Sequence, residues 1–150
     1  MLIVVSNRQR AVRVDLADLQ AFATAALAAC LKLPARQSDS LGRLEQVDVV
    51  LVSDKRITEI HQRFLDDATP TDVITFQHGE IVISAETAKR QARHFRTSVQ
   101  HELRLYLAHG LLHLHGYEDK TARGAATMKR LQEKLVDRAL SRSMAATEAS

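Results

Sequence analysis

Two histidines, His109 and His113, stand four residues apart in the segment LAHGLLHLHGYEDKT. On a helix this spacing places both imidazoles on one face, one turn apart, where they can bind the same metal ion. Gly116 follows where a helix C-cap glycine belongs, so the chain can reverse and bring Glu118 or Asp119 back towards the imidazoles. The pattern therefore predicts a metal site with two histidines and one of these carboxylates.

A pair of histidines at this spacing is weak evidence alone, because the chain has 7 histidines and ordinary surface residues can produce it. The residue after His109 is Gly110, whereas HExxH metalloproteases carry their general-base glutamate there. A peptidase is therefore disfavoured, and a water must be activated by the metal or by a base from another segment. His115 is expected to point away from the pair, as an exposed or core residue. Glu102 is either an outer partner of the site or an exposed carboxylate in the first helical turn.

Regular elements must position this motif. Apolar residues recur at steps of three and four after an N-cap at Asp15, which predicts an amphipathic helix. The β-branched run VDVVLV predicts a strand buried on both faces, followed by a helix capped by Asp54. The expected elements are strands over 2–6, 47–52, 72–76 and 80–84 (the last two a hairpin), an extended segment over 10–14, and helices over 16–33, 55–64, 85–94, 98–115 and 121–140.

Strands in the first half and helices in the second predict an α+β fold, a single domain in which helices cover one small sheet. With 150 residues, 45% of them hydrophobic, the chain can bury a core without disulfides. We expect one domain over 1–143 and a flexible tail over 144–150. No secretory signal or membrane span is expected, and the single cysteine, Cys30, has no disulfide partner, which favours the cytoplasm. The net charge of +3 is compatible with a polyanionic partner.

Three segments resemble the YbeY family of bacterial metal-dependent endoribonucleases and ribosomal RNA maturation factors. They are TPTDVITF (69–76), GEIVISAETAKRQA (79–92) and HGLLHLHGYED (109–119), in the order and spacing of that family. The resemblance implies a zincin-like α+β fold with a mixed sheet and one zinc ion held by three side chains and a water. It also implies that this water attacks an RNA phosphodiester, with ribosomal RNA and ribosomal subunits as partners and ribosome quality control as the setting.

The family usually holds its zinc with three histidines, and here Asp119 occupies the position of the third. Zinc accepts an aspartate oxygen, so the resemblance implies the ligand set His109, His113 and Asp119, with the adjacent Glu118 as the rival carboxylate. Relative to three histidines, this set is more tolerant of harder ions such as manganese. The family's arginine before the PTD segment aligns with Leu65, and Arg63, two residues away, is the candidate to take its place.

The remaining candidates concern RNA contact. Lys89, Arg93 and Arg96 recur at helical spacing and form a basic stripe, which is either a solvated face or a surface for RNA phosphates. Only 4% of residues are aromatic, which argues against base stacking as the main mode of recognition. Two alternative functions remain: a non-catalytic RNA-binding ribosome assembly factor with a structural metal, and a non-haem iron oxygenase. The oxygenase ranks last because the sequence lacks any further oxygenase context.

Overall fold

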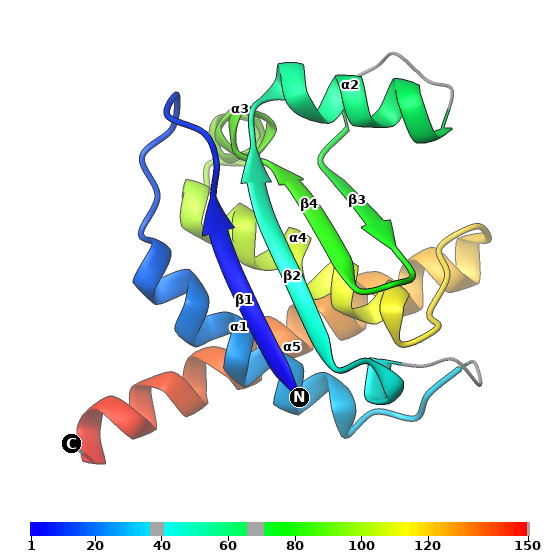
Figure 1. The fold of residues 1–150 in the computed structure, drawn as a ribbon. Coiled ribbons are helices and arrows are strands. Elements are labelled where there is room, and N and C mark those ends of the chain that lie inside the picture. The colour runs from blue at the N-terminus through cyan, green and yellow to red at the C-terminus, as the bar shows by residue number, and fades with distance from the viewer. Residues whose placement is uncertain (37–40, 66–70, 150) are drawn as a thin grey trace.

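The computed structural model describes residues 1–36, 41–65 and 71–149, with side chains up to residue 141. Its centre is a four-stranded sheet of order β1-β2-β4-β3, shown in Figure 1. Three strands are parallel and the edge strand β3 is antiparallel to β4, so the expected hairpin and mixed sheet are both confirmed. The strands are β1 (Leu2–Asn7), β2 (Gln46–Val52), β3 (Val73–Phe76) and β4 (Glu80–Ser84).

Helices cover the sheet unequally. Side chains of α1, α4 and α5 form the main core with one face of the sheet, and α2 packs a small second cluster on the opposite face. This arrangement is the expected α+β fold. The helices are α1 (Leu16–Leu31), α2 (Asp54–Leu65), α3 (Ala85–Phe95), α4 (Val99–Leu114) and α5 (Ala122–Ala149), with a 3-10 turn at Leu41–Arg43.

Two local predictions need correction. Strand β2 is buried on both faces only at its C-terminal end, because on the face that α2 covers Asp48 is exposed, Val50 is half-buried and Val52 is buried. Residues 10–14 form no strand. The Gln9 side chain closes this loop on itself, donating to the Val12 carbonyl at 2.8 Å and accepting from the Val12 N–H at 2.9 Å.

Helix α5 continues to Ala149, through the segment expected to be a tail. The division into a domain over 1–143 and a flexible tail stays a prediction. Among the described residues, the helices lack an 18-residue stretch apolar enough for a bilayer crossing.

Helix α4 carries the histidine pair, and both of its ends are specified locally. The Ser98 side chain caps the start by accepting from the His101 N–H at 3.0 Å. At the other end Gly116 adopts φ 97°, and the Tyr117 N–H donates to the Leu112 carbonyl at 3.0 Å. This left-handed termination confirms the predicted reversal after Gly116.

Glu102 is neither exposed nor a partner of the histidines. Its side chain is buried in the first turns of α4 and accepts from the Thr97 hydroxyl at 2.7 Å, which joins the helix to the segment that precedes it.

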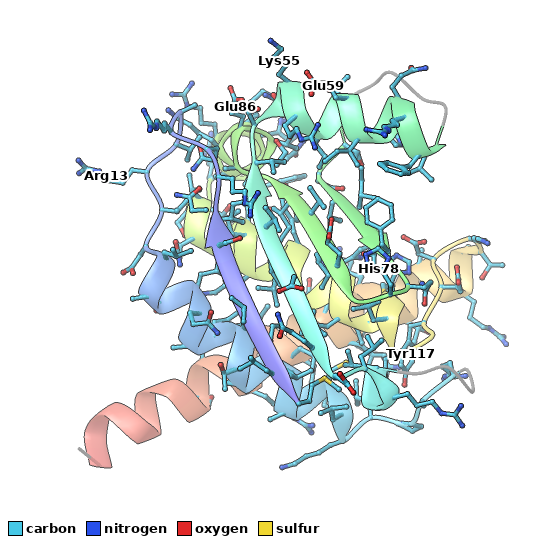
Figure 2. All side chains as sticks on the ribbon, viewed as in Figure 1. Arg13, Lys55, Glu59, His78, Glu86 and Tyr117 are labelled. Carbon is cyan, nitrogen blue, oxygen red and sulfur yellow. The ribbon has the colours of Figure 1, made fainter. Side chains whose placement is uncertain are left out.

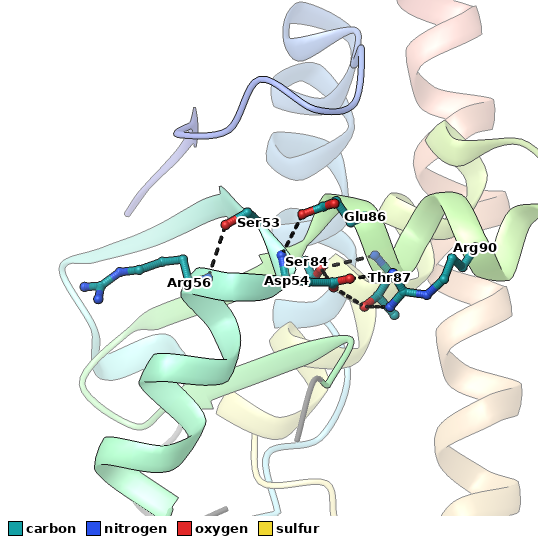
Figure 3. Close-up of polar contacts among 7 residues, drawn as sticks. All are labelled: Ser53, Asp54, Arg56, Ser84, Glu86, Thr87 and Arg90. Atoms are coloured by element: carbon teal, nitrogen blue, oxygen red, sulfur yellow. Dashed lines mark hydrogen bonds and ion pairs between the residues drawn. The ribbon is translucent and has the colours of Figure 1, made fainter. Parts of the chain in front are cut away.

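A carboxylate network anchors the start of α2 to the start of α3 (Figure 3). Asp54 accepts from the hydroxyls of Ser84 at 2.6 Å and Thr87 at 2.8 Å, and it pairs with the Arg90 guanidinium. The N-cap of α2 is therefore Ser53, which accepts from the N–H of residue 56 at 3.1 Å, and not Asp54 as predicted. The Asp54 carboxylate does not cap α2 because it is engaged by Ser84, Thr87 and Arg90.

We expect Asp54→Ala to lower the free energy of unfolding by about 1–3 kcal/mol at neutral pH, because the buried hydroxyls of Ser84 and Thr87 lose the carboxylate that accepts from them. Burial alone would raise the pKa of Asp54, but hydrogen bonds from Arg90, Ser84 and Thr87 outweigh burial and hold it below its usual value. A carboxyl with a depressed pKa stabilises the fold above its unfolded pKa and loses this contribution as pH falls through the folded value.

Urea unfolding at a series of pH values measures both effects. The gap between wild type and Asp54→Ala should close in acid, whereas the exposed-site control Asp48→Ala should stay within about 0.5 kcal/mol of wild type throughout. A gap that persists unchanged at low pH would contradict the ionic role of Asp54.

Candidate metal centre

Three side chains predicted from the sequence converge at the end of α4. The Nε2 atoms of His109 and His113 lie 2.9 Å apart. The carboxylate of Asp119, beyond the reversal, approaches them at 3.6 Å from His109 and 3.8 Å from His113. One ligand atom from each residue lies within 4.8 Å of the others, so this group could hold a metal ion.

The other nitrogen of each histidine is occupied by a protein acceptor. His109 Nδ1 donates to Gln132 Oε1 at 2.9 Å, and His113 Nδ1 donates to the Tyr117 carbonyl at 3.0 Å. Because both acceptors are oxygens, the proton resides on Nδ1 and the Nε2 lone pairs point to each other and to Asp119. The rings are thus oriented for a ligand at Nε2 before any metal binds.

Electrostatics favour the metal-binding form of His113. Burial lowers its pKa, the neighbouring His109 lowers it further, and the Asp119 carboxylate opposes these effects without cancelling them. The imidazole of His113 is therefore neutral at physiological pH, the form that ligates a metal.

The position that carries a glutamate in HExxH peptidases faces the sheet. A Cβ built on Gly110 would lie 2.8 Å from the Ile81 side chain, closer than real atoms approach. Helix α4 packs against β4 through this glycine, so a larger side chain there would separate the helix from the sheet. The close packing gives a physical reason for the missing glutamate.

The three candidate ligands line an open cleft of about 520 Å³. Helix α2 contributes His61 and Leu65 to it, and the edge strand β3 forms another wall. Thr71 lines the cleft, which places the PTD segment near the site, although Pro70 lies outside the described residues. The Asp72 side chain accepts from the Val73 N–H at 2.8 Å and so satisfies a backbone donor at the start of β3.

Other candidates lie elsewhere. The Arg63 guanidinium lies 5.5 Å from the centre of the Phe64 ring, and Arg63 is not among the cleft residues. His115 is buried, and its Nε2 donates to the Leu33 carbonyl at 2.8 Å, so it is a core histidine. Lys89 and Arg93 are exposed on α3, and Arg96 lies just beyond it in the left-handed conformation with φ 56°.

Sequence reasoning missed Gln132 of α5. A signal was present, because Met128, Leu131 and Leu135 form the buried face of this helix and Gln132 falls on the same face. A polar residue in an apolar stripe needs a partner, and here the partner is His109.

We expect Gln132→Leu to weaken zinc binding about 10–100-fold, because the His109 ring loses the acceptor that holds its proton on Nδ1. Gln132→Glu should retain the affinity, since a carboxylate accepts the same hydrogen bond. Titration against a chromophoric chelator measures both, with Gln91→Leu on α3 as the matched control. Equal affinities for Gln132→Leu and Gln91→Leu would show that Gln132 does not support the site.

Comparison with known proteins identifies the family. A family model described as "Endoribonuclease YbeY" matches residues 4–140. A protein of that name from Syntrophus aciditrophicus is 31% identical, with 90% of this chain and 88% of the relative aligned. Another, from Anaeromyxobacter, is 37% identical, but the match covers 64% of this chain and only 56% of the relative. The solution structure of TM1509 from Thermotoga maritima has a TM-score of 0.64 and 25% identity, with 100% of this chain and 96% of that chain covered. The chain belongs to the YbeY family.

Proposed function

We propose that this protein is a metal-dependent endoribonuclease acting in ribosomal RNA maturation and ribosome quality control, with one zinc ion held by His109, His113 and Asp119. The observation that carries the proposal is the convergence of three ligand atoms within 4.8 Å in an open cleft. Its context is a family whose relatives bear the name endoribonuclease.

The donor set fits a catalytic ion. Two imidazoles and a carboxylate are ligands that zinc accepts, and catalytic zinc sites have three protein ligands, whereas structural zinc sites have four. Among the described residues the group contains three members, which disfavours the structural metal of a non-catalytic assembly factor. When bound, the zinc ion supplies a Lewis acid that polarises a phosphoryl oxygen and lowers the pKa of water. The aspartate ligand also makes manganese acceptable.

The protein's own groups bind and orient the RNA. Thr71, Thr75 and Gln77 offer hydroxyl and amide groups along one wall of the cleft, suited to phosphate and ribose oxygens. Lys120 is the one lysine or arginine among the described cleft residues, and its Nζ lies 3.8 Å from the Glu118 carboxylate. With Leu65 in the position of the family's arginine, Lys120 is the cation best placed to hold a phosphate oxygen, and Arg63 stays a weaker candidate.

We propose the cytoplasm as the setting and ribosomal RNA and ribosomal subunits as partners, with Lys89, Arg93 and Arg96 as a further RNA-binding surface. These three side chains are exposed, as such contacts require. Burial raises the pKa of the Cys30 thiol to about 12, so this cysteine stays protonated and unreactive at neutral pH.

The test is cleavage of ribosomal RNA fragments by the purified protein, with and without chelator and after zinc is restored. Cleavage should require the metal and should disappear in His109→Ala prepared in the same way, which controls for contaminating nucleases. If the zinc-loaded wild type cleaves no faster than His109→Ala, the hydrolytic role is wrong and the assembly-factor function takes its place.

A further inference from the structure

A second pocket, of about 320 Å³, adjoins the metal cleft and shares the residue Glu118 with it. It lies between the segment after α1, the turn that carries Asp119, and the start of α5. The residues that line it are Arg36, Gly116, Tyr117, Glu118, Thr121, Arg123, Gly124 and Thr127. None of the three candidate metal ligands is among them.

Three hydrogen bonds fix residues 33–36 to the end of α4. His115 Nε2 donates to the Leu33 carbonyl at 2.8 Å, the Tyr117 hydroxyl donates to the Pro34 carbonyl at 2.8 Å, and the Arg36 N–H donates to the His115 carbonyl at 3.0 Å. The Arg36 guanidinium also lies over the Tyr117 ring, 5.2 Å from its centre. Arg36 is thus held in place at this pocket by contacts to the segment that also supplies the metal site.

The charges in this pocket are unbalanced. Arg36 and Arg123 both line the pocket, and neither makes an ion pair within the described part of the chain. Among the described lining residues, Glu118 is the one that carries a carboxylate, and this carboxylate lies 3.8 Å from Lys120. Thr121 and Thr127, which carry hydroxyl groups, also line the pocket. Guanidinium groups with adjacent hydroxyls are the usual partners of phosphate.

The start of α5 adds little to this attraction, because Thr121 already accepts from the Gly124 N–H at 3.0 Å. The start of α5 instead brings the pocket close to the turn that carries Asp119. A Cβ on Gly124 would lie 2.7 Å from the Glu118 carbonyl oxygen, so the turn carrying Asp119 packs directly on this pocket. A ligand held by Arg36 and Arg123 therefore lies next to the metal cleft.

We infer that this pocket is a phosphate-binding subsite. Resting on the proposed function, its ligand is an RNA backbone phosphate close to the one held in the metal cleft. The subsite places the RNA strand across the turn that carries Asp119 and so sets which phosphodiester bond lies in the metal cleft.

The test is the double substitution Arg36→Gln with Arg123→Gln in the zinc-loaded protein. Fluorescence anisotropy with a labelled single-stranded RNA, checked for integrity on a gel, should show affinity lowered about tenfold, with a salt slope smaller by about 0.7. Glu118→Gln should strengthen binding. The matched control is Arg10→Gln with Arg13→Gln, two exposed arginines removed in the same way, and it should change affinity less than about twofold. Figure 2 shows Arg13 at the opposite end of the molecule from Tyr117.

Titration with inorganic phosphate and with a 5′ mononucleotide separates the sources of the phosphate. If the double variant loses these ligands but binds RNA like wild type, the RNA assignment is overturned and the pocket serves free phosphates. If it loses neither, the subsite does not exist. RNA cleavage by wild type is measured in parallel. If the wild type cleaves RNA and the double variant binds RNA as well as the wild type does, only the subsite is rejected. If the wild type does not cleave RNA, the proposed function is rejected.

Discussion

Wild-type protein is expected to purify with about one equivalent of transition metal per chain, and His109→Ala or His113→Ala is expected to purify without it. The Nε2 atoms of these residues lie 2.9 Å apart at the centre of the site, so each variant leaves two of three donors. Two protein donors rarely hold zinc, and we expect the affinity to fall by more than about a hundredfold.

Elemental analysis of the purified proteins, followed by zinc titration, measures the loss. His101→Ala is the matched control, because this histidine belongs to the same helix but not to the converging group. A His109→Ala protein that retains a full equivalent of zinc would place the metal elsewhere on the chain. Circular dichroism of each variant shows whether the loss reflects unfolding.

Asp119→Ala is expected to lose metal affinity and ribonuclease activity, whereas Glu118→Ala keeps most of the metal affinity. The distances support this difference, because the Asp119 carboxylate lies 3.6 Å from His109, while the Glu118 carboxylate is directed to Lys120 at 3.8 Å. Asp119→His should retain zinc, since an imidazole restores the ligand that the family usually has at this position.

Metal titration of the three variants, with cleavage assays on the same preparations, separates the two carboxylates. The assignment fails if Glu118→Ala loses the metal and Asp119→Ala keeps it. In that case Glu118, and not Asp119, occupies the position of the family's third ligand. Retention of metal but not activity in Asp119→His would assign a second role to the aspartate, in binding or orienting the RNA.

Local signals made the metal centre predictable from the amino-acid sequence. The spacing of His109 and His113 needs only a helix to bring the two rings together, and Gly116 needs only its own backbone freedom to end that helix. Helix caps such as Ser98 and the hairpin between β3 and β4 depend on residues within a few positions of each other. Family resemblance then selected Asp119 over Glu118, which spacing alone left open.

Contacts between distant segments required the folded structure. Gln132 of α5 contacts His109, and the Asp54 carboxylate pairs with Arg90 of α3 instead of capping α2. Arg36 lies against the Tyr117 ring, 81 residues later in the chain. The partial burial of the second face of β2 has the same origin, because a β-branched run fits a strand covered on either one face or two. Side-chain type sets what each residue can bind, but packing of the helices on the sheet sets which partner it meets.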